Sequence, residues 1–351
     1  MSASYQENAT SEMNVAPVAD KGYRIIQIHP TLKCNLTCKH CYSGSAPQFK
    51  EELSLTQLKT FLREAWEEGF NAIALSGGEP FIYSGIHELL AYSKSIGYNN
   101  SVTTNGMLFK PGGKNLDALQ YVDLLAISLD GEPEHHNYMR NAPKAFERME
   151  AGLELVKDHM DAYGFIHTVT SKTFPSLLWM SDYAAHHKAK LLQLHPLESS
   201  GRGIDMMDDL GLSPDDLHRV YILAHYLKNK YDGQILVEID VIHRDILEKN
   251  PAVAYAHTKT NGAKITDHLR EIIVDEKGAL LPISHGFSKF FQIGNLNDGL
   301  SFHAQSQAFV TDTLPALQQM FDRTYNEIME NEHLELVNWA EIAVTNSHFP
   351  V

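Results

Sequence analysis

Short apolar runs alternate with amphipathic stretches between residues 23 and 196. The apolar runs predict strands, and helical periodicity lies between them. The predicted strands cover residues 25–29, 72–76, 101–104, 124–129, 165–170 and 191–195, and the helices 54–68, 86–96, 116–121, 145–160 and 177–187. This alternation predicts a parallel sheet with right-handed crossovers. Because six units are fewer than the eight of a closed barrel, we expect an α/β fold with a partial (β/α)6 barrel.

The pattern changes after Pro196. A helix is expected from Ser213 to about Lys230, a strand over 234–241, a hairpin over 271–283 and a long helix over 313–332. The first 22 residues are polar and lack periodicity. We therefore expect a flexible tail at 1–22, a partial-barrel domain at 23–232 and a small α+β C-terminal extension at 233–351.

The composition and net charge indicate which classes of binding partner to expect. The chain has 351 residues, of which 43% are hydrophobic, and a formal net charge of −15. An acidic chain is a poor partner for nucleic-acid phosphates or an anionic membrane surface, so we expect neither. The sequence contains no run of 18 apolar residues, and its N-terminus has no apolar segment typical of a signal peptide. Its three clustered cysteines favour a reducing, cytoplasmic location.

The three cysteines all lie in one short segment, Cys34, Cys38 and Cys41, with the spacing C-x3-C-x2-C. Their thiolates can converge on one metal centre, and soft thiolates favour zinc or iron–sulfur. Structural zinc takes four protein ligands, and a [4Fe–4S] cluster usually takes four cysteines. With no fourth cysteine, a cluster here would keep one iron open for chemistry. The alternatives are a zinc site completed by His40 or another histidine, and unliganded buried thiols.

A second motif, Ser76-Gly77-Gly78-Glu79-Pro80, follows the second predicted strand. Paired glycines let the backbone approach a ligand closely, although the same letters also fit a plain turn. In this order and spacing, the two motifs resemble those of the radical S-adenosylmethionine (radical SAM) superfamily. The resemblance covers about residues 23–200. It is greatest to the peptide-modifying branch, which carries a C-terminal SPASM or twitch extension.

The resemblance implies an enzyme with two cofactors. Cys34, Cys38 and Cys41 would hold three irons of one [4Fe–4S] cluster, and the amine and carboxylate of S-adenosylmethionine would bind the fourth iron. One-electron reduction, from a donor such as flavodoxin or ferredoxin, would release a 5′-deoxyadenosyl radical that abstracts hydrogen from a substrate.

The resemblance also implies contacts to S-adenosylmethionine. The cradle for its amine would be Gly77, Gly78 and Glu79. Arg140 would pair with its carboxylate, as suits a guanidinium, although it also fits a surface arginine. The other implied contacts are His40 near the adenine, Asn105 in a Thr-Asn-Gly turn, Ser128 and Asp130 in a Ser-x-Asp-Gly motif, and Leu197 after the sixth strand.

The chain departs from the branch at its C-terminal end. Relatives of that branch carry further cysteines for auxiliary clusters, whereas the expected position here is near Ser284 and no cysteine is left. We therefore expect a single cluster. Candidate substrate contacts are His195, Glu198, Arg202 and His285, each of which also fits a structural role. Arg202, in a Gly-Arg-Gly loop, is the best candidate for an acidic substrate group.

Three functions remain open. The first is radical chemistry on a peptide or protein side chain, as in maturation of a ribosomally made peptide. The second is the same chemistry on a small molecule such as a nucleoside or sugar, which the missing auxiliary cysteines favour. The third is a non-catalytic cluster-bearing scaffold or electron-transfer protein. Glu79, Ser128 and Arg140 argue against the third, because a cluster holder needs no cradle for methionine.

Overall fold

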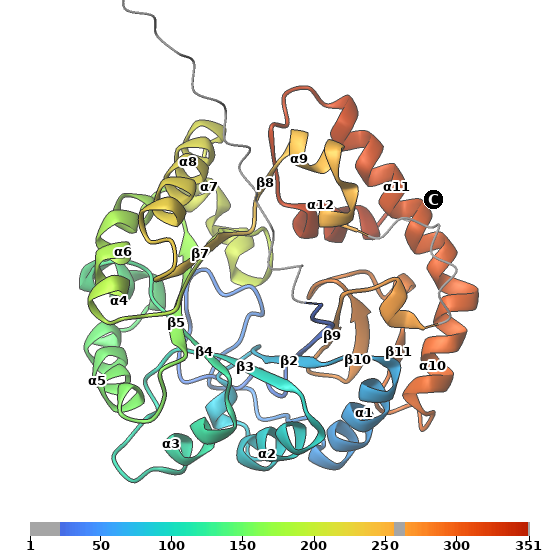
Figure 1. Ribbon diagram of the computed structural model, residues 1–351, viewed down its shortest axis with the longest axis horizontal. Coiled ribbons are helices and arrows are strands. Elements are labelled where there is room, and N and C mark those ends of the chain that lie inside the picture. Colours follow the sequence, from blue (N-terminus) through green and yellow to red (C-terminus); the bar gives the residue numbers. More distant parts are fainter. Residues whose placement is uncertain (1–21, 256–263, 350–351) are drawn as a thin grey trace, which may run out of the picture.

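A ten-stranded sheet forms the centre of the computed structural model, which describes residues 22–255 and 264–349 (Figure 1). The strand order is β11-β10-β9-β1-β2-β3-β4-β5-β6-β7, and all pairings from β9 to β7 are parallel. The strands are β1 Ile25–Ile28, β2 Ala72–Leu75, β3 Asn99–Thr104, β4 Leu124–Ser128, β5 Tyr163–Val169, β6 Leu191–Pro196, β7 Leu236–Ile239, β9 Glu271–Val274, β10 Ala279–Pro282 and β11 Gly294–Asn295. The consecutive order from β1 to β6 confirms the predicted partial barrel.

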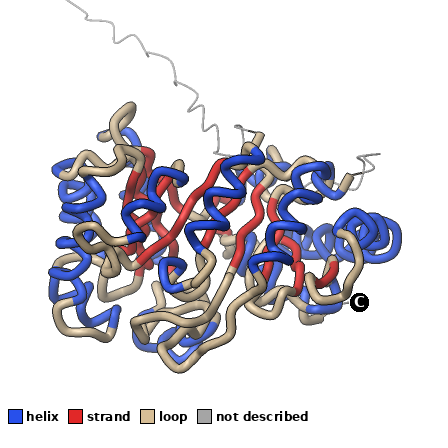
Figure 2. Tube along the Cα trace, turned by 90° about the horizontal axis from the view of Figure 1, so that it is seen from below, coloured by secondary structure: helices blue, strands red, loops and turns tan. Residues whose placement is uncertain are grey.

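Helices cover the outer face of the curved sheet, and Figure 2 shows the strands inside this layer. The helices are α1 Leu55–Glu68, α2 Ile86–Ile96, α3 Lys114–Ala118, α4 Pro133–Arg140, α5 Ala145–Lys157, α6 Leu177–His186, α7 Met207–Leu210, α8 Pro214–Lys230, α9 Arg244–Lys249, α10 Phe302–Ala308, α11 Leu314–Glu330 and α12 Trp339–Ser347. Local sequence explains α1 well. Ser54 caps its start by accepting from the backbone of Gln57, and Gly69 ends it with a positive φ of 106°.

The C-terminal part of the chain extends the same sheet at both ends. β7 pairs in parallel with β6, whereas β9 pairs in parallel with β1. The predicted hairpin is confirmed, since β9 and β10 are antiparallel, and β11 continues it. A separate two-stranded sheet joins β8, Ile242–His243, to β12, Leu336–Val337. The hairpin consequently lies directly beside the strand that leads into the cysteine segment.

Two segments are helical although no helix was predicted for them. α4 is a helix of eight residues that the apolar pattern missed, because most of its side chains are polar. The Gly-Arg-Gly segment around Arg202, expected to be a loop, is part of a 3-10 helix, Gly201–Met206. The predicted tail lies outside the described residues, except for residue 22. In the described ranges, none of the helices has both the length and the apolar character that crossing a membrane requires.

The parallel order brings the carboxyl ends of β1 to β6 to one edge of the sheet. The segments that follow these strands carry the cysteines, the Gly-Gly-Glu-Pro residues 77–80, Asp130 and Arg202. Ligands of parallel sheets bind at this edge. The fold therefore gathers motifs from widely separated parts of the sequence.

Candidate active site

The cysteine segment, residues 34–46, is a loop held by the side chain of Arg202. Nε of Arg202 donates to the carbonyl of Cys38 at 2.7 Å, Nη1 to that of Gly44 at 2.8 Å, and Nη2 to that of Ser45 at 2.9 Å. The backbone N–H of Arg202 also donates to the carbonyl of Cys41 at 3.0 Å. The guanidinium was expected to meet an acidic substrate group. It is instead occupied by the backbone of the loop, because the turn after β6 packs against it.

The three thiols are buried or half-buried and influence one another. Burial, followed by the charge of Glu79, raises the pKa of Cys34 to about 12. Burial also raises the pKa of Cys38. Thiols in such a place stay protonated unless a metal binds them, since a thiolate needs a compensating cation. Three soft ligands on one loop, with no other cysteine in the chain, fit a [4Fe–4S] cluster held by Cys34, Cys38 and Cys41.

Gly77 and Gly78 pack so closely on the chain after β1 that neither position has room for a side chain. A Cβ at Gly77, where φ is +90°, would lie 2.8 Å from Cβ of His29. A Cβ at Gly78 would lie only 2.3 Å from the carbonyl oxygen of Lys33. Backbone N–H groups of Gly78 and Glu79 donate to the carbonyls of Thr31 and Lys33. The turn is thus a backbone cradle beside Cys34 that only glycines can form.

Glu79 is buried and links this turn to the end of β3. Its Oε1 accepts from the hydroxyl of Thr104 at 2.8 Å and its Oε2 from the backbone of Asn105 at 2.9 Å. Burial raises the pKa of Glu79 to about 7, although these hydrogen bonds oppose the rise. The amide of Asn105 donates in turn to Asn35, inside the cysteine loop. Glu79 therefore connects the turn after β2, the end of β3 and, through Asn105, the cysteine loop. This structural role is separate from a contact with the methionyl amine.

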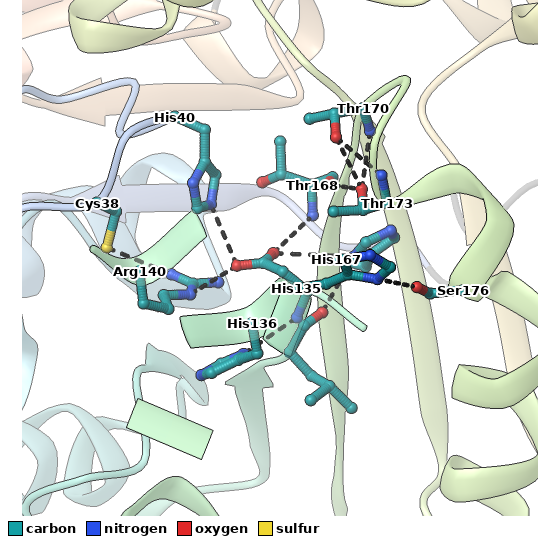
Figure 3. A network of polar contacts seen from close by, with 12 residues as sticks. Cys38, His40, His135, His136, Arg140, His167, Thr168, Thr170, Thr173 and Ser176 are labelled. Atoms are coloured by element: carbon teal, nitrogen blue, oxygen red, sulfur yellow. Dashed lines mark hydrogen bonds and ion pairs between the residues drawn. The ribbon is translucent and has the colours of Figure 1, made fainter. Parts of the chain in front are cut away.

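Asp130, after β4, is the centre of a buried polar network (Figure 3). Its Oδ2 lies 2.7 Å from Nε of Arg140 and 3.6 Å from Nε2 of His40. Nη1 of Arg140 reaches Sγ of Cys38 at 3.8 Å. Burial alone would raise the pKa of Asp130, but Arg140 and then His40 hold it well below its usual range. The carboxylate that Arg140 meets in this structure is thus Asp130, within the protein.

Two histidines complete the network and were missed in the sequence. The backbone N–H of Asp130 donates to Nδ1 of His136 at 3.2 Å, and Nδ1 of His167 lies 3.8 Å from Oδ1 of Asp130. His136 precedes Arg140 by one helical turn, so a correct prediction of α4 would have placed the two side chains on the same helix face. His167, on β5, carries no local signal. In Figure 3, His167 lies across the network from Cys38.

The remaining predicted contacts lie around the same edge. Ser128 ends β4, and Leu197 is buried against Met139 of α4. Nδ1 of His195 contacts the carboxylate of Asp240. Burial and the nearby Glu341 raise the pKa of Glu198 to about 7.

The last candidate, His285, lies on the hairpin side of the site. Its ring packs 4.9 Å from that of His29 and 5.7 Å from that of Tyr42, between centroids. Burial and the neighbouring His285 lower the pKa of His29 to about 3, so its imidazole is neutral. The site is therefore bordered by neutral imidazole as well as by thiols.

Comparison with known proteins agrees with this arrangement. Residues 28–174 match the radical SAM superfamily, whose members use a [4Fe–4S] cluster and S-adenosylmethionine. The chain is 30% identical over 199 residues to an AdoMet-dependent heme synthase of Methanosarcina barkeri, covering 56% of each protein. It is also 30% identical over 197 residues to the mycofactocin maturase MftC of Mycolicibacterium smegmatis, covering 54% of this chain and 49% of MftC. The chain thus spans about half the length of these curated relatives.

A solved structure extends the likeness to the fold of nearly the whole chain. Streptococcus suis SuiB, bound to its precursor peptide SuiA, superposes with a TM-score of 0.62 at 14% identity. The alignment covers 91% of this chain and 70% of SuiB. At this identity the likeness concerns the fold, including the C-terminal part that adds strands beside β1.

Proposed function

We propose that the chain, whose residues 28–174 match the radical SAM superfamily, is an enzyme that cleaves S-adenosylmethionine reductively. Cys34, Cys38 and Cys41 would hold the cluster. When bound, the reduced cluster and S-adenosylmethionine supply a 5′-deoxyadenosyl radical that abstracts hydrogen from the substrate. The observation that carries the proposal is one loop with all three cysteines, clamped by Arg202 and adjoining the glycine cradle at 77–78.

The residues of the chain would bind and orient the reactants. The backbone around Gly77 and Gly78 offers polar groups for the methionyl amine, with Glu79 behind them. Arg140, whose Nε pairs with Asp130, keeps further N–H donors for a carboxylate. His40, Asn105, Ser128 and Leu197 would contact the nucleoside. Glu198 and His195, at the end of β6, border the space open to a substrate.

The proposed substrate is a peptide or protein side chain. Support comes from a maturase among the relatives and from the fold shared with SuiB, which was solved with a precursor peptide. A small molecule is the second candidate, because an AdoMet-dependent heme synthase is equally similar in sequence. We further propose a cytoplasmic enzyme that takes its electron from a flavodoxin or ferredoxin and has no nucleic-acid or membrane partner.

Anaerobic reconstitution tests the chemistry. We expect about four irons per chain and formation of 5′-deoxyadenosine with dithionite and S-adenosylmethionine. Cys38→Ala should abolish both the bound iron and the product. Stoichiometric zinc with almost no iron in the wild-type protein would refute the proposal.

Hydrogen transfer from a labelled substrate separates the two substrate classes. Where a short precursor peptide is encoded beside the gene, that peptide, deuterated in its side chains, should transfer deuterium to 5′-deoxyadenosine. Deuterium transfer from a labelled small molecule, with none from the peptide, would select the second candidate.

A further inference from the structure

We propose that His29, Glu276 and His285 bind a divalent transition-metal ion at a site separate from the three cysteines. One ligand atom from each side chain lies within 4.8 Å of the other two. His29 follows β1, Glu276 follows the adjacent strand β9, and His285 follows β10. The pairing of β9 with β1 therefore brings together residues that are about 250 positions apart in the chain.

Two polar atoms of this cluster are buried without a hydrogen-bond partner among the described residues. They are Nδ1 of His29, whose side chain is fully buried, and Oε2 of Glu276. The other ring nitrogen of His29 lies 3.1 Å from the hydroxyl of Tyr42. A buried polar atom left without a hydrogen-bond partner destabilises the folded state. Two such atoms in one cluster point to a ligand that satisfies both.

The charged groups around Glu276 do not satisfy it. Nε2 of His285 and Nζ of Lys277 each lie 4.0 Å from one of its oxygens, beyond hydrogen-bond distance. Lys277 is 73% exposed on its side chain, so its ammonium is solvated. Asp275 accepts instead from the backbones of Lys277 and Ala279 in the hairpin turn. The carboxylate of Glu276 is thus left for a cation between the two imidazoles.

The donor set indicates the class of metal. Two imidazoles and one carboxylate bind zinc in catalytic sites and non-haem iron(II), and both sites keep open positions. Ligand atoms about 2.1 Å from a tetrahedral ion lie about 3.4 Å from each other. The 4.0 Å between His285 and Glu276 is close to this value. Small side-chain rotations would shorten the longest distance between two of the ligand atoms to about this value.

A cavity of about 290 Å³ gives the ion access. Glu276 and His285 line it, and the other charged or titratable residues of its lining are Asp275, Lys277, Lys289 and His348. The opposite side of the cluster packs on the candidate active site, since His29 contacts Gly77 and Tyr42. A three-ligand ion here would therefore keep its open position toward this cavity.

Zinc binding to the full-length holoenzyme tests the proposal. The loaded cluster occupies the thiols, so additional zinc reports on other sites. After loosely bound metal is removed by anaerobic gel filtration, which leaves the cluster in place, zinc titration followed by calorimetry and elemental analysis should show one zinc per chain. Zinc-edge X-ray absorption should give Zn–N and Zn–O distances of about 2.0–2.1 Å and no Zn–S distance of about 2.3 Å. S-adenosylmethionine is omitted, so the result does not depend on the proposed activity.

Matched variants locate the ion. Glu276→Gln and His285→Ala should each weaken zinc binding at least about tenfold. His348→Ala, which lines the same cavity outside the cluster, should bind zinc as the wild type does. Circular dichroism and thermal unfolding check that each variant is folded. Absence of stoichiometric zinc in the wild type, unchanged affinity in both ligand variants, or a Zn–S distance would each overturn the proposal.

Discussion

Replacing Arg202 with lysine tests whether this side chain holds the cluster-binding loop. Arg202 donates to three carbonyls, of Cys38, Gly44 and Ser45, through three different nitrogens. A lysine ammonium is a single point charge and cannot reproduce the planar geometry. We expect it to reach one of the three carbonyls, so two hydrogen bonds are lost while the positive charge is kept.

The size of the effect follows from these two bonds. Hydrogen bonds that involve a charged group contribute roughly 1.5–3 kcal/mol each, so two contribute at least about 3 kcal/mol. Arg202 is only half-buried, and water replaces part of this. We therefore expect a net loss of about 2 kcal/mol in the free energy that holds the loop closed. Since 1.4 kcal/mol corresponds to a factor of ten, the open loop should become about thirtyfold more populated.

Cluster release is the suitable assay. The reconstituted protein is mixed with an iron chelator under anaerobic conditions, and the loss of its visible absorption is followed. If release proceeds through the open loop, Arg202→Lys should lose the cluster about thirtyfold faster than the wild type. Arg219→Lys, at an exposed ion pair with Asp216, should be unchanged. If Arg202→Lys releases its cluster at the wild-type rate, Arg202 does not hold the cysteine loop closed.

Three further changes have defined outcomes. Asp130→Asn leaves the buried Arg140 without its charged partner and should cost roughly 3–5 kcal/mol in urea unfolding, whereas Asp182→Asn, at an exposed pair, should cost less than about 1 kcal/mol. Equal urea midpoints for the two variants would show that the buried pair of Asp130 and Arg140 does not stabilise the fold. Gly78→Ala places a Cβ 2.3 Å from the carbonyl oxygen of Lys33, so the affinity for S-adenosylmethionine, measured by calorimetry, should fall at least about tenfold. An unchanged affinity would show that the glycine turn does not contribute to binding. Burial raises the pKa of Glu271 from 4.5 to about 7, so its contribution to stability is present below pH 4.5 and declines as the pH rises to about 7. Glu271→Gln should flatten this part of the pH profile of urea midpoints, and an unaltered profile would show that Glu271 is not the cause.

Much of the barrel was predictable because its signals are local. An apolar run of four to seven residues specifies a buried strand, and Ser54 and Gly69 mark the ends of α1 in the letters themselves. The cysteine loop and the glycine pair could also be recognised, since their spacing along the chain carries the information. α4 was missed because an eight-residue helix rich in polar side chains has almost no apolar periodicity.

The partners of the charged residues could not be predicted, because they depend on contacts between distant segments. The loop carbonyls that Arg202 binds, about 160 residues away, and the pairing of Arg140 with Asp130 carry no signal in the sequence. The proximity of His29 to Glu276 and His285 likewise arises only when β9 pairs with β1. Sequence patterns thus determined which strands, turns and thiols exist. The curvature and pairing of the sheet decided which buried charges meet, because an unpaired charge in the interior is stable only beside a partner that folding brings to it.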